Sequence, residues 1–243
     1  MNFKKLISPA PLPFDYDEWQ KKSFNERVLM LCKAWAIQGY GAPVAVYIFY
    51  ILKIFIYILV WLGFCSLPSN LGSWSTIEQW WFKPEAIGKA MAWSMLFEVL
   101  GFGCGSGPLT ARYFPPFGAF LHFFRPKTIK QPLFPKLIKS NTRNWLDVIL
   151  FSVYTISIVR LLIAPEINTS LILPIIITLP ILTLFDKTIF IASRGEHYFI
   201  GLFCFLFPLS TIAGLKLVWV AIWIWAATSK LNRHFPSVIG VMV

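Results

Sequence analysis

The stretch PVAVYIFYILKIFIYILVWLGFC, residues 43–65, decides the class of fold. It contains a single charged side chain, Lys53. It is also long enough to supply the ~20 residues that an α-helix needs to cross the hydrocarbon core of a bilayer. A helix at the surface of a soluble protein would carry polar side chains along one face, and this stretch has no such face. We therefore predict a transmembrane helix over residues 43–65.

The composition of the whole chain supports this assignment. Hydrophobic residues make up 57% of the 243 residues and charged residues 14%, whereas a soluble domain carries about 25% charged residues. The net charge of +11 does not indicate nucleic acid, because the basic residues lie in short connectors between apolar runs. This distribution is typical of the positive-inside rule for membrane proteins. We expect membrane lipids, and no nucleic acid, as partners.

Further apolar runs predict further spans, at residues 87–105, 145–163 and 170–191, the last with kinks at Pro174 and Pro180. A final apolar region, 198–228, would form about 46 Å of helix, too long for one straight span and too short for two. It is either a pair broken near Pro208 and Gly214 or one tilted span. The predicted fold is all-α and polytopic, with five or six transmembrane helices. We expect it in the inner (plasma) membrane of the cell, with a cytoplasmic N-terminus.

The N-terminal segment, residues 1–42, is expected to lie outside the membrane, so that residues 43–243 form the transmembrane domain. A helix is predicted from Asp17 to Gln38, with Asp15 as its N-terminal cap. Its large apolar side chains fall near one face, which indicates an amphipathic helix lying flat on the inner leaflet. The alternative is a helix packed against a partner protein.

The connector 109–144 is the most basic segment and contains no acidic residue. Its five prolines exclude a long helix, so we expect a structured cytoplasmic loop against the lipid headgroups. The side chains expected to bind anionic headgroups are Arg112, Arg125, Lys127 and Lys130, together with Arg194 further along the chain.

Two charges are expected within the membrane. Lys53 and Glu98 lie at similar depths in consecutive spans of opposite direction, so they can form a buried pair. Such a pair either fixes the packing of the two helices or forms a proton or substrate site.

Glycines alternate at positions 101, 103, 105 and 107. A period of two does not place them on one face of a helix, so the second span is expected to unwind here. The freed backbone N–H groups, with Arg112 nearby, could hold an anion. The alternative is a helix end that needs close packing.

Four side chains are candidates for acid–base chemistry on an anionic headgroup: His122, Asp186, Glu196 and His197. The alternative is that they are interfacial charges that neutralise their neighbours. No metal or cofactor is predicted, because the three histidines lie at span ends and Cys32, Cys65, Cys104 and Cys204 form no C-x-x-C pair. Bound lipids are the only expected ligands.

The run GFGCGSGPLTARYFPPFGAFLHFFRPKTIKQPLFP, residues 101–135, resembles the N-terminal half of a family of large bacterial multi-pass membrane proteins of unknown function. The end of the chain, KLNRHFPSVIGVMV, resembles a segment that continues in that family. The resemblance implies a longer relative, and it implies no reaction. Because the sequence ends without a polar tail, we expect another membrane subunit or a C-terminal companion chain to complete the assembly. A more distant similarity is to the horizontally transferred transmembrane domain of vitamin K-dependent carboxylases.

Three functions are compatible with these features. The first is an accessory or structural subunit of a larger membrane assembly, which the few polar residues in the spans favour. The second is an enzyme, or half of one, that binds or modifies lipid at the cytoplasmic face. The third is a transporter that depends on Lys53, Glu98 and a broken last helix.

Overall fold

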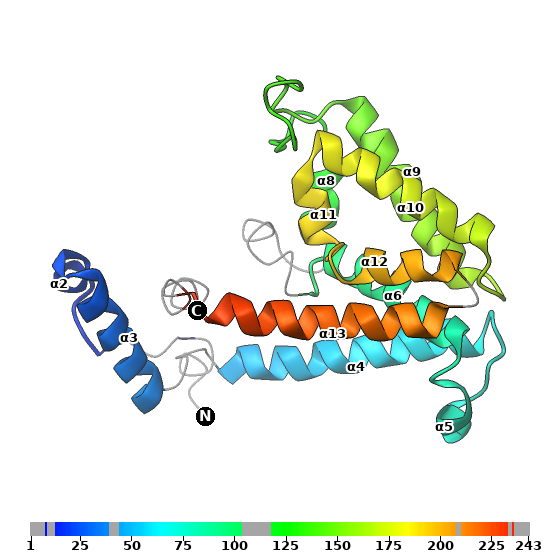
Figure 1. Cartoon of the computed structure of the whole chain (residues 1–243), viewed down its shortest axis with the longest axis horizontal. Helices are drawn as coiled ribbons and strands as arrows, with labels where there is room; N and C mark the ends of the chain where they lie inside the picture. The colour runs from blue at the N-terminus through cyan, green and yellow to red at the C-terminus, as the bar shows by residue number, and fades with distance from the viewer. Residues whose placement is uncertain are drawn as a thin grey trace. The chain divides into compact units, whose positions relative to one another are not determined.

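The structure, a computed structural model, describes residues 8, 13–38, 44–103, 118–207, 210–232 and 235 (Figure 1). Within these residues the secondary structure is helical, apart from an isolated antiparallel bridge between Ile129 and Thr142. The chain divides into two compact units, residues 1–56 with 221–243, and residues 57–220.

In the described part of the chain, three helices are long and apolar enough to cross a membrane: α4 (Val44–Ser66), α9 (Trp145–Ile163) and α13 (Thr211–Lys230). Helix α10 (Thr169–Phe185) is apolar but has 17 residues, and α6 (Pro84–Val99) has 16. At 1.5 Å per residue they are about 26 and 24 Å long, short of the ~30 Å hydrocarbon core. The predicted all-α membrane fold is confirmed, whereas five or six spans stay a prediction.

Two predicted spans end earlier than expected. Helix α6 ends at Val99 rather than at residue 105. Helix α10 ends at Phe185 rather than at residue 191, and it does contain Pro174 and Pro180. Its end has a clear cause, because Asp186 is extended and its side chain caps the next helix, α11 (Lys187–Ala192).

The last apolar region, residues 198–228, does not form one continuous helix, in agreement with the expected break near Pro208 and Gly214. It forms α12 (Tyr198–Phe203), the 3₁₀ turn η2 (Cys204–Leu206) and then α13. The break precedes Thr211, and Gly214 lies inside α13. One continuous tilted span is therefore wrong, and α12 is too short to be a span of its own.

The N-terminal helix is interrupted where a single helix was predicted. Asp15 accepts hydrogen bonds from the backbone N–H groups of Asp17 (2.8 Å) and Glu18 (3.0 Å), which confirms the predicted cap of α2 (Tyr16–Lys21). Ser23 then starts α3 (Phe24–Gln38), since its backbone N–H and its hydroxyl both donate to the Glu26 carboxylate. This capping pair, not recognised in the sequence, divides the helix in two.

The core of the unit 57–220 is an antiparallel pair of helices, α9 and α10, joined by the short turn after Ala164. Each helix buries apolar residues three or four positions apart, which form one stripe facing the partner helix. On α9 the stripe includes Phe151, Tyr154, Ile158 and Leu161, and on α10 it includes Ile172, Ile175, Leu179 and Leu182. Helix α6 packs against α9 and α12, and it is largely buried despite its charges.

The C-terminal part of α4 packs antiparallel to α6 through polar contacts between their aromatic and small residues. The Tyr57 hydroxyl lies 2.8 Å from the Ser94 hydroxyl, and Trp61 donates to the Ala86 carbonyl at 3.0 Å. The Trp93 indole donates to the Tyr57 carbonyl at 3.1 Å. These pairings fix the register of the two helices over several turns.

Gly101 explains why α6 ends where it does. Its φ of +92° lies in the left-handed region that favours glycine. The backbone N–H groups of Gly101 and Phe102 donate to the carbonyls of Glu98 (3.0 Å) and Phe97 (3.1 Å), the pattern of a Schellman cap. The rings of Phe97 and Phe102 stack at 5.1 Å across this cap. At Gly101 the chain therefore forms a closely packed helix end, the alternative to an open backbone, and Gly105 and Gly107 lie outside the described residues.

Candidate functional site

The basic loop between α8 (Gly118–Phe123) and α9 is attached to the helices by two buried ion pairs. The first joins Lys130 to Asp147, in the first turn of α9. The Lys130 ammonium donates to both carboxylate oxygens, at 2.8 and 2.6 Å, and each side chain is 2% exposed. Asp147 also accepts a hydrogen bond from the backbone N–H of Asn144. The pair therefore ties the loop to the start of α9.

The second ion pair joins Arg143, at the end of the loop, to Asp186, after α10. The Arg143 guanidinium also donates to the main-chain carbonyl of His122 at 3.0 Å and lies over the Phe123 ring. Asp186 accepts further bonds from the Gln131 backbone and from the backbone and hydroxyl of Thr188. One carboxylate thus joins the loop, the end of α10 and the start of α11.

These contacts limit the binding and catalytic roles that were predicted for Lys130, Asp186 and His122. Lys130 and Asp186 are 3% and 1% exposed and are engaged in structural pairs, so neither faces an outside ligand. His122 lies beside this cluster, where burial and the Arg143 guanidinium lower the pKa of the imidazole below 6.5. These surroundings favour the neutral form of the ring.

Other predicted headgroup-binding cations do face outward. Arg125 and Lys127 are exposed, in the half of the loop that leads toward Lys130. Lys136 and Lys139, further along the loop, are exposed as well. Arg112 lies outside the described residues.

Arg194, Glu196 and His197 form a second polar group, in the turn between α11 and α12. The Glu196 carboxylate lies 3.1 Å from His197 Nδ1 and 3.8 Å from Arg194 Nε. Arg194 has a φ of +51°, an uncommon conformation for a residue other than glycine. Glu196 is about half exposed, so this turn is open to solvent or headgroups and the ion pair of Glu196 with Arg194 is weak.

Lys89 was not singled out from the sequence, and it has the most unusual environment of the described cations. It is fully buried in α6, and its ammonium donates to three main-chain carbonyls. The acceptors are Phe64 near the end of α4 (2.8 Å), Leu162 near the end of α9 (2.9 Å) and Ala164 just after it (2.8 Å). Carbonyls at helix C-termini lack partners within the helix and carry partial negative charge, which suits a cation.

The predicted intramembrane charges lie in different units. Lys53 extends over the rings of Phe49 (5.3 Å) and Tyr50 (4.5 Å), neighbours on its own helix. Glu98 is 7% exposed, and its carboxylate fills the space where a side chain at Gly103 would lie. The pairing of Lys53 with Glu98 stays a prediction.

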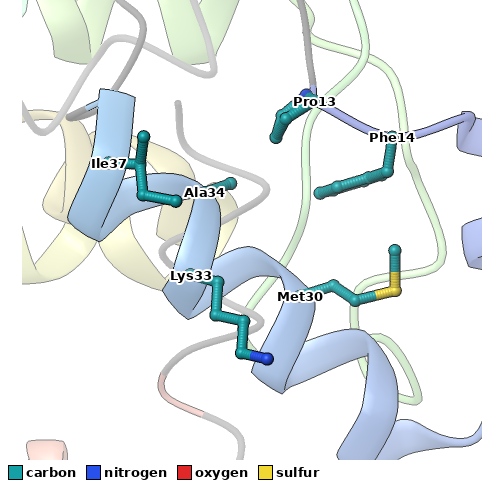
Figure 2. Close-up of a pocket in the computed structure, with 6 residues that line it drawn as sticks. All are labelled: Pro13, Phe14, Met30, Lys33, Ala34 and Ile37. Carbon is teal, nitrogen blue, oxygen red and sulfur yellow. The ribbon is translucent and has the colours of Figure 1, made fainter.

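An apolar groove lies on the N-terminal helices. Figure 2 shows Pro13 and Phe14 facing the side of α3 that carries Met30, Ala34 and Ile37. Lys33 completes the lining with its aliphatic stem. The groove is open to its surroundings, and the described residues that line it include no acid or nucleophile.

Comparison with protein families gives a match that covers the whole chain. Residues 1–243 match the model of a family described as "Transmembrane protein of unknown function (DUF3556)". The chain belongs to this family. No curated protein and no solved structure matches it. The family supports the membrane assignment of this DUF3556 protein, and it names no reaction, ligand or partner.

In addition to Lys89, two residues of this DUF3556 member that form buried ion pairs were not recognised from the sequence. Arg143 was counted only as one more loop cation, and Asp147 was not singled out. Asn144 and Asp147 form an N-terminal capping box, in which each side chain accepts from the other's backbone N–H. The Asn-x-x-Asp spacing before an apolar run could have revealed this helix start.

Proposed function

We propose that this protein is an accessory, structural subunit of a larger membrane assembly. The proposal rests on the low burial of two of the spanning helices by the rest of the chain. Only 6% of the apolar window in α4 and 11% of that in α13 are buried, against 50% in α9. Helix α9 shows how a span in this chain packs when it has neighbours. The other two offer long apolar faces to lipid or to another membrane chain.

The roles of the buried charges support the same proposal. Lys130, Arg143, Asp147 and Asp186 fasten a loop to helices, and Lys89 joins helix ends. A lipid-modifying site would need an acid or base that reaches its substrate. Asp186, the most deeply placed of the predicted candidates, is fully used in holding the loop.

The sequence of α13 is also suitable for a helix–helix interface. It exposes Trp219, Trp223 and Trp225 along with Leu217 and Ile224. Large rigid aromatic side chains are typical anchors of interfaces between proteins.

Native mass spectrometry after mild detergent extraction from the natural membrane tests this proposal. The chain alone has a mass of 27.9 kDa. We expect a complex that contains this chain and at least one other polypeptide in a fixed ratio. Replacing Glu196 or His197 by alanine should leave this complex assembled with the same subunits in the same ratio. Extraction of the chain as a monomer with lipid only would overturn the proposal.

A further inference from the structure

The cations of the basic loop are divided between its interior and its surface. From residue 118 to 146 the chain contains six lysines and arginines and no acidic residue. Lys130 and Arg143 point inward, where each pairs with a carboxylate from the helices. The other four, Arg125, Lys127, Lys136 and Lys139, are exposed and have no acidic neighbour in the loop sequence. The outer surface of the loop is therefore positively charged.

Large apolar side chains lie exposed among these surface cations. Leu137 is 81% exposed and Ile129 72%, although both belong to an ordered part of the loop. Other exposed apolar residues of the same segment are Leu121, Leu133, Phe134, Trp145 and Leu146. Exposed apolar groups beside cations are the combination found where a protein surface enters the headgroup region of a bilayer.

The loop holds this surface in one conformation. Its two arms pair through backbone bonds from Lys127 to Arg143 (2.7 Å) and from Lys130 to Asn141 (2.9 Å). Between the arms the backbone N–H groups of Leu137 and Ile138 both donate to the Phe134 carbonyl, which forms a single turn. Figure 1 shows the loop, in green, at the end of the bundle where α9 begins. The surface does not need to fold when it binds.

We propose that this loop surface binds the anionic lipid leaflet next to the spanning helices. Leu137, Ile129 and Phe134 enter the boundary between headgroups and acyl chains, and Lys136 and Lys139 contact lipid phosphates. Charge complementarity favours this occupant. The N-terminal segment 13–38 carries four acidic and four basic residues, so it has no such preference. The proposal holds whether or not the chain has a partner subunit.

Depth measurements on the full chain in lipid nanodiscs test this proposal. A nitroxide label is placed at Leu137→Cys in a protein whose native cysteines are replaced by serine. In discs of phosphatidylcholine with phosphatidylglycerol we expect the label to collide more with oxygen, and less with a water-soluble nickel reagent, than in phosphatidylcholine discs. Lys136→Glu with Lys139→Glu should remove this difference. Lys83→Glu, which reverses an exposed charge before α6, should not change it.

A second measurement uses the protein with its native cysteines. After extraction from mixed discs, the two phospholipids retained by each chain are counted by mass spectrometry. We expect phosphatidylglycerol to be enriched over its share in the disc, and Lys139→Glu to reduce the enrichment while Lys83→Glu preserves it. The proposal is overturned if the Leu137 label is equally accessible to water in both kinds of disc. It is also overturned if phosphatidylglycerol is not enriched, which would leave an acidic protein as the partner of this surface.

Discussion

Lys89 joins three parts of the molecule through one ammonium group. Its three carbonyl acceptors come from the ends of α4 and α9, and its own helix lies between them in sequence. A buried lysine usually destabilises a protein, because its charge is removed from water. Here the C-termini of the helices supply a negative potential that compensates for this loss. Nothing in the sequence pattern around residue 89 indicated this, since the acceptors belong to the backbone of distant segments.

Replacing Lys89 with methionine should destabilise the protein by about 3 kcal/mol, because buried carbonyls lose their donor. For a chain of this size the apparent melting temperature in detergent should fall by roughly 6–12 °C. The matched control is Lys83→Met, at an exposed lysine six positions earlier, which should change it by less than ~2 °C. Equal melting temperatures for the two variants would refute the assigned role of Lys89.

At the scale of elements, the helices begin and end where local chemistry requires. Asp15, Ser23, Asn144 and Asp186 start helices, and Gly101 ends one. The cap at Asp15 and a helix end at the glycine run were predictable, because both depend on residues close together in sequence. The ends of α6 and α10 were placed too late, because hydrophobicity continues past the residues that stop each helix.

The cap at Gly101 predicts a specific cost for a side chain at that position. Gly101→Ala forces alanine into a positive φ and should destabilise the protein by about 1–2 kcal/mol. Gly63→Ala is the control, since a methyl group there meets nothing within 4 Å inside helix α4. It should stabilise by about 0.5–1 kcal/mol through helix propensity. Denaturation of both variants followed by circular dichroism checks the opposite signs.

At the scale of the whole molecule, the sequence predicted the class of fold better than the site. Apolar runs set the membrane assignment and the helical class, because bilayer physics acts on composition and length alone. The ion pairs Lys130–Asp147 and Arg143–Asp186 join residues 17 and 43 positions apart, which no local pattern specifies. For that reason Lys130 and Asp186 were taken as ligand-binding or catalytic candidates when they hold the loop in place.

The direction in which the helices cross the bilayer is the central claim. The shared contact of Lys89 places the ends of α4 and α9 together, so both helices must begin on the opposite face. We therefore predict that the chain preceding α4 and the basic loop lie on one side of the membrane, and that the turn between α9 and α10 lies on the other.

Labelling of single cysteines in sealed vesicles of known orientation tests this claim most directly. The native Cys32, which is exposed on α3, is compared with Lys139→Cys and Glu166→Cys, each in a background without other cysteines. A membrane-impermeant maleimide should reach positions 32 and 139 from the same side and position 166 only from the other. Labelling of positions 32 and 139 from opposite sides would contradict the account.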